Sequence, residues 1–118
     1  MKVTKTYFML MAADVVRGAS FYKTAFGLRS GGYESPEWTE LVQDGAMVAI
    51  HHGGGSTERD TGLGFYVDDI EAACRAVATA GGKIVKPPEA RTDEGIRLAT
   101  AVDTEGNRFS IAQDMPRA

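Results

Sequence analysis

The sequence has few of the residues that mark secreted, membrane-bound or nucleic-acid-binding proteins. It has one cysteine in 118 residues, so no internal disulfide can form. Its net charge is -3, and no basic run is present, which argues against nucleic acid as a partner. Charged residues soon interrupt the apolar N-terminal stretch, so it predicts neither a signal peptide nor a membrane span. We therefore expect a cytoplasmic protein with no nucleic-acid or membrane partner.

The composition is that of one compact domain. Hydrophobic residues make up 43% of the chain, which is enough for a core, and the length suits a single domain over residues 1–118. The single cysteine, Cys74, lies in an Ala-rich helical stretch. We interpret it as a small buried apolar residue rather than a reactive group.

The N-terminal half is predicted to form a strand, a helix and three further strands. Residues 4–11 form an apolar run, and apolar residues then recur at helical spacing after Asp14. The Asp14 carboxylate is suited to cap the helix, and Gly27 to end it. Short runs separated by turn residues predict three strands, at 28–33, 37–42 and 46–52.

The same order returns later in the chain. A shift of 55 residues takes Asp14 to Asp69 and Gly27 to Gly82, so the predicted helix-capping residues of the two halves coincide. The Asp44-Gly45 turn reappears as Glu105-Gly106 at a shift of 61, and the six extra residues fall in a predicted loop at 87–95. The predicted strands of this half are residues 62–67, 83–86, 96–102 and 107–112. The chain is therefore predicted to be an α+β protein with two βαβββ halves, 1–52 and 62–114, joined by a linker at 53–61.

Several motifs of this pattern resemble the vicinal oxygen chelate superfamily. They are Phe21-Tyr22, Phe26-Gly27, Val67-Asp68-Asp69-Ile70 and Asp103-Thr104-Glu105-Gly106-Asn107. The superfamily includes glyoxalase I, extradiol dioxygenases, fosfomycin resistance enzymes and bleomycin resistance proteins. The resemblance implies a concave, partly open mixed sheet with the helices on its outer face. It does not imply one activity, because metal enzymes and pure binding proteins share this scaffold.

The resemblance also implies where a metal would bind. Metal-bearing members use His, Gln or Glu side chains on the first and last strands of each half. Those positions here fall at Tyr7, Ala49, Gly62 and Ser110, none of which supplies an imidazole or a carboxylate. A register shift of two would bring His51 inward, but without companion ligands. We therefore expect no metal ligands and no cofactor.

Strand alternation sorts the remaining side chains onto two faces of the sheet. One apolar set should pack under the helices: Phe8, Leu10, Val48, Ile50, Leu63, Phe65, Phe109 and Ile111. The opposite, concave face is rich in aromatic and methionine side chains, which suit a mostly apolar or planar ligand. The predicted ligand-binding residues are Tyr7, Met9, Trp38, Glu40, Met47, His51, Tyr66, Arg108 and Ser110. The alternative is that they pack as core or as a subunit interface.

Three functions are compatible with this pattern. The favoured one is a binding protein similar to the bleomycin resistance proteins, which sequesters a drug or metabolite without chemistry. The second is a lyase, isomerase or cyclase that uses Glu40, His51 or Tyr7 as acid–base groups. A glyoxalase-type metal enzyme is third, because it needs ligands that the chain lacks. We also expect a homodimer, since long strand edges and an apolar concave face would be poorly covered in one chain.

Overall fold

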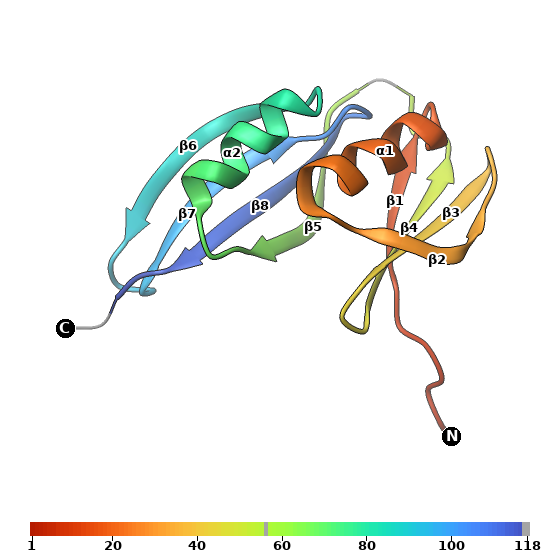
Figure 1. Cartoon of the computed structure of the whole chain (residues 1–118), viewed down its shortest axis with the longest axis horizontal. Coiled ribbons are helices and arrows are strands. Elements are labelled where there is room, and N and C mark those ends of the chain that lie inside the picture. The colour runs from red at the N-terminus through yellow and green to blue at the C-terminus, as the bar shows by residue number, and fades with distance from the viewer. Residues whose placement is uncertain (56, 117–118) are drawn as a thin grey trace.

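The computed structural model describes residues 1–55 and 57–116, and it confirms an α+β fold of two βαβββ modules (Figure 1). The first sheet has the order β1-β4-β3-β2, and the second has the equivalent order β5-β8-β7-β6. In each module the first strand lies parallel to the last, and the other neighbours are antiparallel. The strands are β1 (Phe8–Ala12), β2 (Arg29–Glu34), β3 (Trp38–Gln43), β4 (Ala46–His52), β5 (Arg59–Tyr66), β6 (Lys83–Arg91), β7 (Ile96–Val102) and β8 (Asn107–Asp114).

The two helices begin at the predicted aspartates. Helix α1 (Val15–Phe26) starts after Asp14, whose carboxylate accepts a hydrogen bond from the third backbone N–H beyond it at 3.0 Å. Helix α2 (Ile70–Thr79) starts in the same way after Asp69. These bonds satisfy backbone donors that a helix N-terminus otherwise leaves free. Gly27 ends α1 in the left-handed conformation, with φ of 69°, as its position predicts.

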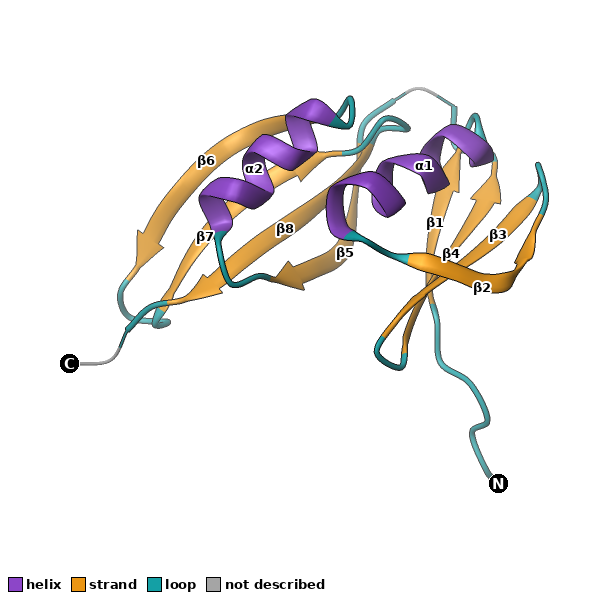
Figure 2. Cartoon of the chain, viewed as in Figure 1, coloured by secondary structure: helices purple, strands orange, loops and turns teal. Residues whose placement is uncertain are grey.

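The hydrophobic core lies between the helices and one face of both sheets (Figure 2). The apolar set predicted for this side is buried or half-buried there, which confirms the strand alternation. Aromatic rings from both modules meet in this layer, with Phe26 stacked on Phe65 at 4.3 Å between ring centroids and Phe109 edge-on to Phe26 at 5.6 Å. Cys74 packs half-buried against this core, and burial raises the pKa of its thiol, as expected of a structural cysteine.

The loop predicted at 87–95 is wrong, because β6 continues to Arg91. Pro87 and Pro88 lie inside this strand. They are tolerated since β6 is the outermost strand of its sheet, where not every backbone N–H needs a partner. Register shifts on both sides of Lys86 absorb part of the extra length.

Two strand starts differ from the sequence-based boundaries by more than one residue. β1 begins at Phe8 rather than at residue 4, and β5 begins at Arg59, inside the predicted linker 53–61. Arg59 pairs with Asn107 of β8, and a bulge before Gly64 restores the register. Ser56 of the predicted linker lies outside the described residues. Within 1–55 and 57–116, neither helix has the length and apolar character needed to cross a membrane.

Candidate functional site

The face of the sheets opposite the helices carries large apolar side chains that the core does not cover. Tyr7, Met9 and Tyr66 are 52%, 48% and 72% exposed. Ala49 lies on this face as well, between Met9 and Glu40 in the register of the first sheet, yet it is fully buried. The larger neighbouring side chains therefore cover Ala49 and are themselves partly exposed to solvent.

The first module gathers four of the predicted ligand-binding residues into one cluster. The Tyr7 and Trp38 rings meet edge to face, with centroids 5.8 Å apart. His51, directly opposite Trp38 in the register, contacts the same indole at 6.0 Å and so faces the concave side. The indole N–H of Trp38 donates a hydrogen bond of 3.0 Å to Glu40. We call Tyr7, Trp38, Glu40 and His51 the aromatic cluster.

The positions where relatives of the superfamily hold a metal do not fit one here. Ala49 and Gly62 carry no donor atom, and the backbone at Gly62 has a φ of 78°, a conformation that favours glycine. Tyr7 and Ser110 offer only hydroxyl groups, which are poor ligands for a divalent ion without carboxylate or imidazole partners. In the described part of the chain, no group of three or more His, Cys, Asp or Glu side chains could hold a metal ion.

Around Ser110, the second module lines the concave face with small groups. Gly64 of β5 and Thr100 of β7 both pair with Ser110 of β8, so this part of the face carries two hydroxyl groups and no bulky side chain. Arg108 lies one step further along β8. Its guanidinium group is held at the rim by Glu58 at 3.2 Å and Asp60 at 3.6 Å.

A groove of about 430 Å³ runs along the seam between the modules. Met47 and Tyr66 are the predicted ligand-binding residues that line it. The rest of its wall comes mostly from apolar residues of β1, β4 and β5, including Phe8, Val48 and Leu63. Sequence reasoning missed this groove because strand periodicity assigns faces within a sheet and says nothing about how two sheet edges meet.

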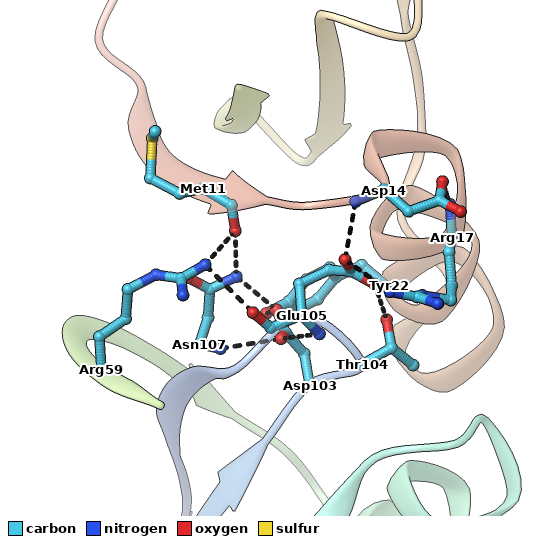
Figure 3. A network of polar contacts seen from close by, with 9 residues as sticks. All are labelled: Met11, Asp14, Arg17, Tyr22, Arg59, Asp103, Thr104, Glu105 and Asn107. Atoms are coloured by element: carbon cyan, nitrogen blue, oxygen red, sulfur yellow. Dashed lines mark hydrogen bonds and ion pairs between the residues drawn. The ribbon is translucent and has the colours of Figure 1, made fainter. Parts of the chain in front are cut away.

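At the other end of the seam a polar network joins the modules (Figure 3). The side chains of Asn107 and Arg59 both donate hydrogen bonds to the carbonyl of Met11 on β1, at 2.8 and 2.6 Å. The buried carboxylate of Glu105 accepts bonds from the backbone N–H of Asp14 at 2.9 Å and from Arg17 Nε at 2.6 Å. The network therefore fixes α1 and β1 to the β7–β8 turn.

Buried ionisable groups in this network have shifted pKa values. Burial, and then the charge of Asp103, raise the pKa of Tyr22 well above its usual value, so its hydroxyl stays protonated and donates to Asp103 at 2.6 Å. Burial also raises the pKa of the Glu105 carboxyl, but hydrogen bonds from Arg17, Asp14 and Thr104 outweigh it and lower the pKa overall. Near neutral pH, Tyr22 is therefore neutral and Glu105 is ionised, and both hold the structure together. They lie apart from the aromatic cluster.

Comparisons with known proteins agree with this architecture. The family model described as a Glyoxalase-like domain matches residues 7–112. A "Probable lactoylglutathione lyase" from Synechocystis sp. is 26% identical over 119 residues, covering 89% of this chain and 91% of that protein.

Solved structures show the same fold. A glyoxalase/bleomycin resistance protein/dioxygenase family enzyme from Burkholderia phytofirmans has a TM-score of 0.77 at 21% identity, covering 92% of this chain and 97% of that one. The fosfomycin resistance protein FosX from Mesorhizobium loti has a TM-score of 0.75 at 18% identity, covering 98% and 95%. Because the family model spans most of the chain, the protein belongs to the Glyoxalase-like domain family of the vicinal oxygen chelate superfamily.

Proposed function

We propose that this protein binds a small, largely apolar or aromatic organic molecule on its concave face, without a bound metal ion and without transforming it. The observation that carries the proposal is the aromatic cluster, in which an exposed Tyr7 ring packs against the half-buried ring of Trp38 on the face that the helices leave uncovered. Flat rings bury a ligand at low cost in side-chain entropy. A drug or metabolite held in this way would be sequestered, as in a bleomycin-resistance type of function.

The lack of suitable metal ligands among the residues that the structure describes supports binding over metal-dependent turnover. An ion at Tyr7, Ala49, Gly62 and Ser110 would exchange water for two hydroxyl groups, which gives it little reason to stay. The homodimer and the cytoplasmic location expected from the sequence stay predictions.

An enzyme is the second candidate, favoured by the relatives named probable lactoylglutathione lyase and by the position of Glu40 and His51 beside Trp38. Under the binding proposal, the purified protein should form no lactoylglutathione from methylglyoxal and glutathione, with or without added Zn²⁺ or Ni²⁺. Steady turnover that Tyr7→Phe or His51→Ala abolishes would replace the binding proposal with the enzymatic one.

Calorimetric titration with a neutral planar probe, 2-naphthylmethanol, tests binding itself. We expect Trp38→Ala to weaken its affinity about tenfold to hundredfold, because one buried aromatic contact is worth about 1–3 kcal/mol. Val16→Ala is the matched control, since Val16 is an exposed apolar residue on α1, away from the concave face. An unchanged affinity in Trp38→Ala, or an equal loss in Val16→Ala, would contradict the proposed site.

A further inference from the structure

We infer that the ligand of the concave face carries a positively charged amino group that binds Glu40, and that Lys5 holds this place in the free protein. The inference rests on the proposed function and names the chemical class of its ligand. Glu40 is the one acidic side chain among the predicted ligand-binding residues, so it sets the sign of charge that the aromatic cluster prefers.

The two carboxylate oxygens of Glu40 have different partners. Oε2 accepts the hydrogen bond from the Trp38 indole at 3.0 Å, which fixes the orientation of the group. Oε1 faces the ammonium group of Lys5 at 3.8 Å, too far for a hydrogen bond. The Glu40 side chain is only 19% exposed, so its carboxylate is partly withdrawn from water, and among the described residues Oε1 has no partner closer than Lys5. A ligand ammonium group could come nearer than Lys5 does.

Lys5 is well placed to be displaced. It precedes β1 in the exposed segment 1–6, and its side chain remains 55% exposed. Figure 1 shows this segment leaving the sheets toward the N-terminus. A pair with so much solvent around one partner contributes little to stability, so its loss costs the protein little.

The rings beside Glu40 suit a cation as well. The negative faces of Tyr and Trp rings attract ammonium groups, and this attraction adds to that of a carboxylate. Gly31 on the neighbouring strand packs closely against Glu40 and places no side chain beside it, since a Cβ there would lie 3.1 Å from the Glu40 carbonyl oxygen and 3.3 Å from its Cβ. On the second module, the positive charge of Arg108 is already balanced by its ion pairs with Glu58 and Asp60.

Three naphthalene probes of one size test the inference by calorimetry in one buffer at one pH. They are 2-naphthylmethylammonium, the neutral 2-naphthylmethanol and the anionic 2-naphthylacetate. We expect the cation to bind about tenfold more tightly than the alcohol, and the anion to bind most weakly. Glu40→Gln, which keeps an oxygen for the Trp38 N–H, should abolish the preference for the cation.

Lys5→Met tests the displacement separately and leaves the fold intact, because the side chain is mostly exposed. It should raise the affinity for the cation by about fivefold at most, the most that a surface pair can contribute, and leave the affinity for the alcohol unchanged. Lys2→Met is the control in the same segment and should change neither affinity. An equal gain in Lys2→Met would show a general charge effect and would contradict the role of Lys5.

The outcomes separate this inference from the proposed function. If the alcohol binds as tightly as the cation and Trp38→Ala weakens both, the binding function stands and the inference is wrong. If Glu40→Gln keeps the preference for the cation, the inference is also wrong. If none of the three probes binds, the proposed function fails and the inference fails with it.

Discussion

The two modules share a scaffold but present different chemistry on the concave face. The first module offers the aromatic cluster and exposed methionine, whereas the second offers the exposed ring of Tyr66 beside the small residues Gly64, Thr100 and Ser110. On the opposite face both modules present the same kind of apolar side chain to the helices. The repeat therefore preserves the packing under the helices, and the concave face is where the modules differ. Under the proposed function, the aromatic cluster of the first module would contact the ligand, and Tyr66 and the small side chains of the second module would line the rest of the face.

The corresponding hairpin turns differ in a second way. Asp44 in the β3–β4 turn is exposed, whereas Asp103 and Glu105 in the β7–β8 turn are 5% and 4% exposed. The second turn crosses the seam and bonds to the first module, and the first turn has no such role in the described structure. Stability should therefore depend on the second turn far more than on the first.

The largest expected effect on stability comes from replacing Gly82. Gly27, which the 55-residue shift aligns with Gly82, serves as the comparison. Gly82→Ala should lower the free energy of unfolding by about 3 kcal/mol, because its new Cβ would lie 2.6 Å from both a Phe21 ring carbon and the Val102 carbonyl oxygen. Gly27→Ala meets open space and suffers only from its left-handed backbone, a loss of about 1 kcal/mol. Urea unfolding followed by circular dichroism measures both. A larger loss in Gly27→Ala would overturn the distinction.

The next effect contrasts the two turns. Asp103 accepts four hydrogen bonds, from the backbone N–H groups of Glu105 and Asn107, the Asn107 side chain and the Tyr22 hydroxyl. Asp103→Asn places an amide donor against these donors and should lower the free energy of unfolding by about 2 kcal/mol. Asp44→Asn should change it by no more than about 0.5 kcal/mol. Similar losses in the two variants would show that the network does not carry this stability.

The smallest expected effect is on the stability of the protein in acid. Because the folded-state pKa of Glu105 is below its ordinary value of 4.5, its contribution is fully present above that pH and is lost as the pH falls through the folded-state pKa. Glu105→Gln should therefore flatten the fall in unfolding free energy between neutral pH and about pH 3. Glu34, paired with Lys23 on the surface, is the control. The pH profile of the Glu34→Gln variant should differ only slightly from that of the wild type, and high salt should remove the difference.

A pH profile of Glu105→Gln that runs parallel to the wild-type profile would show that other groups cause the acid sensitivity. Measurements in low and high salt separate the two carboxylates, since a buried pair is screened much less than an exposed one.

The sequence was sufficient for features that depend on neighbours along the chain. Helix caps at Asp14 and Asp69 and the span of β4 follow from local residue preferences, and the structure confirms them. The length of β6 did not follow, because proline normally interrupts a strand and only an edge position permits Pro87 and Pro88. An edge position is a property of the whole sheet.

The candidate site also contains features that the local sequence predicts and features that it does not. Alternation placed Trp38 and His51 on one face, and the structure brings them into contact. The seam groove and the bond from Arg17 to Glu105 join residues from different modules. No local pattern predicts such contacts, because they depend on how the two finished modules dock.

The seam between the modules has one further consequence. Each sheet ends at the seam, with β1 on one side and β5 on the other, and the described strands form no ladder across it. The network around Met11 and Asn107 fastens one end, while the groove beside Phe8 and Gly62 leaves the other end open. Under the helices, the stacked rings of Phe26 and Phe65 hold the two modules together as well. The relative placement of the two sheets therefore depends on side-chain packing and side-chain hydrogen bonds, and not on a ladder of strands shared between them.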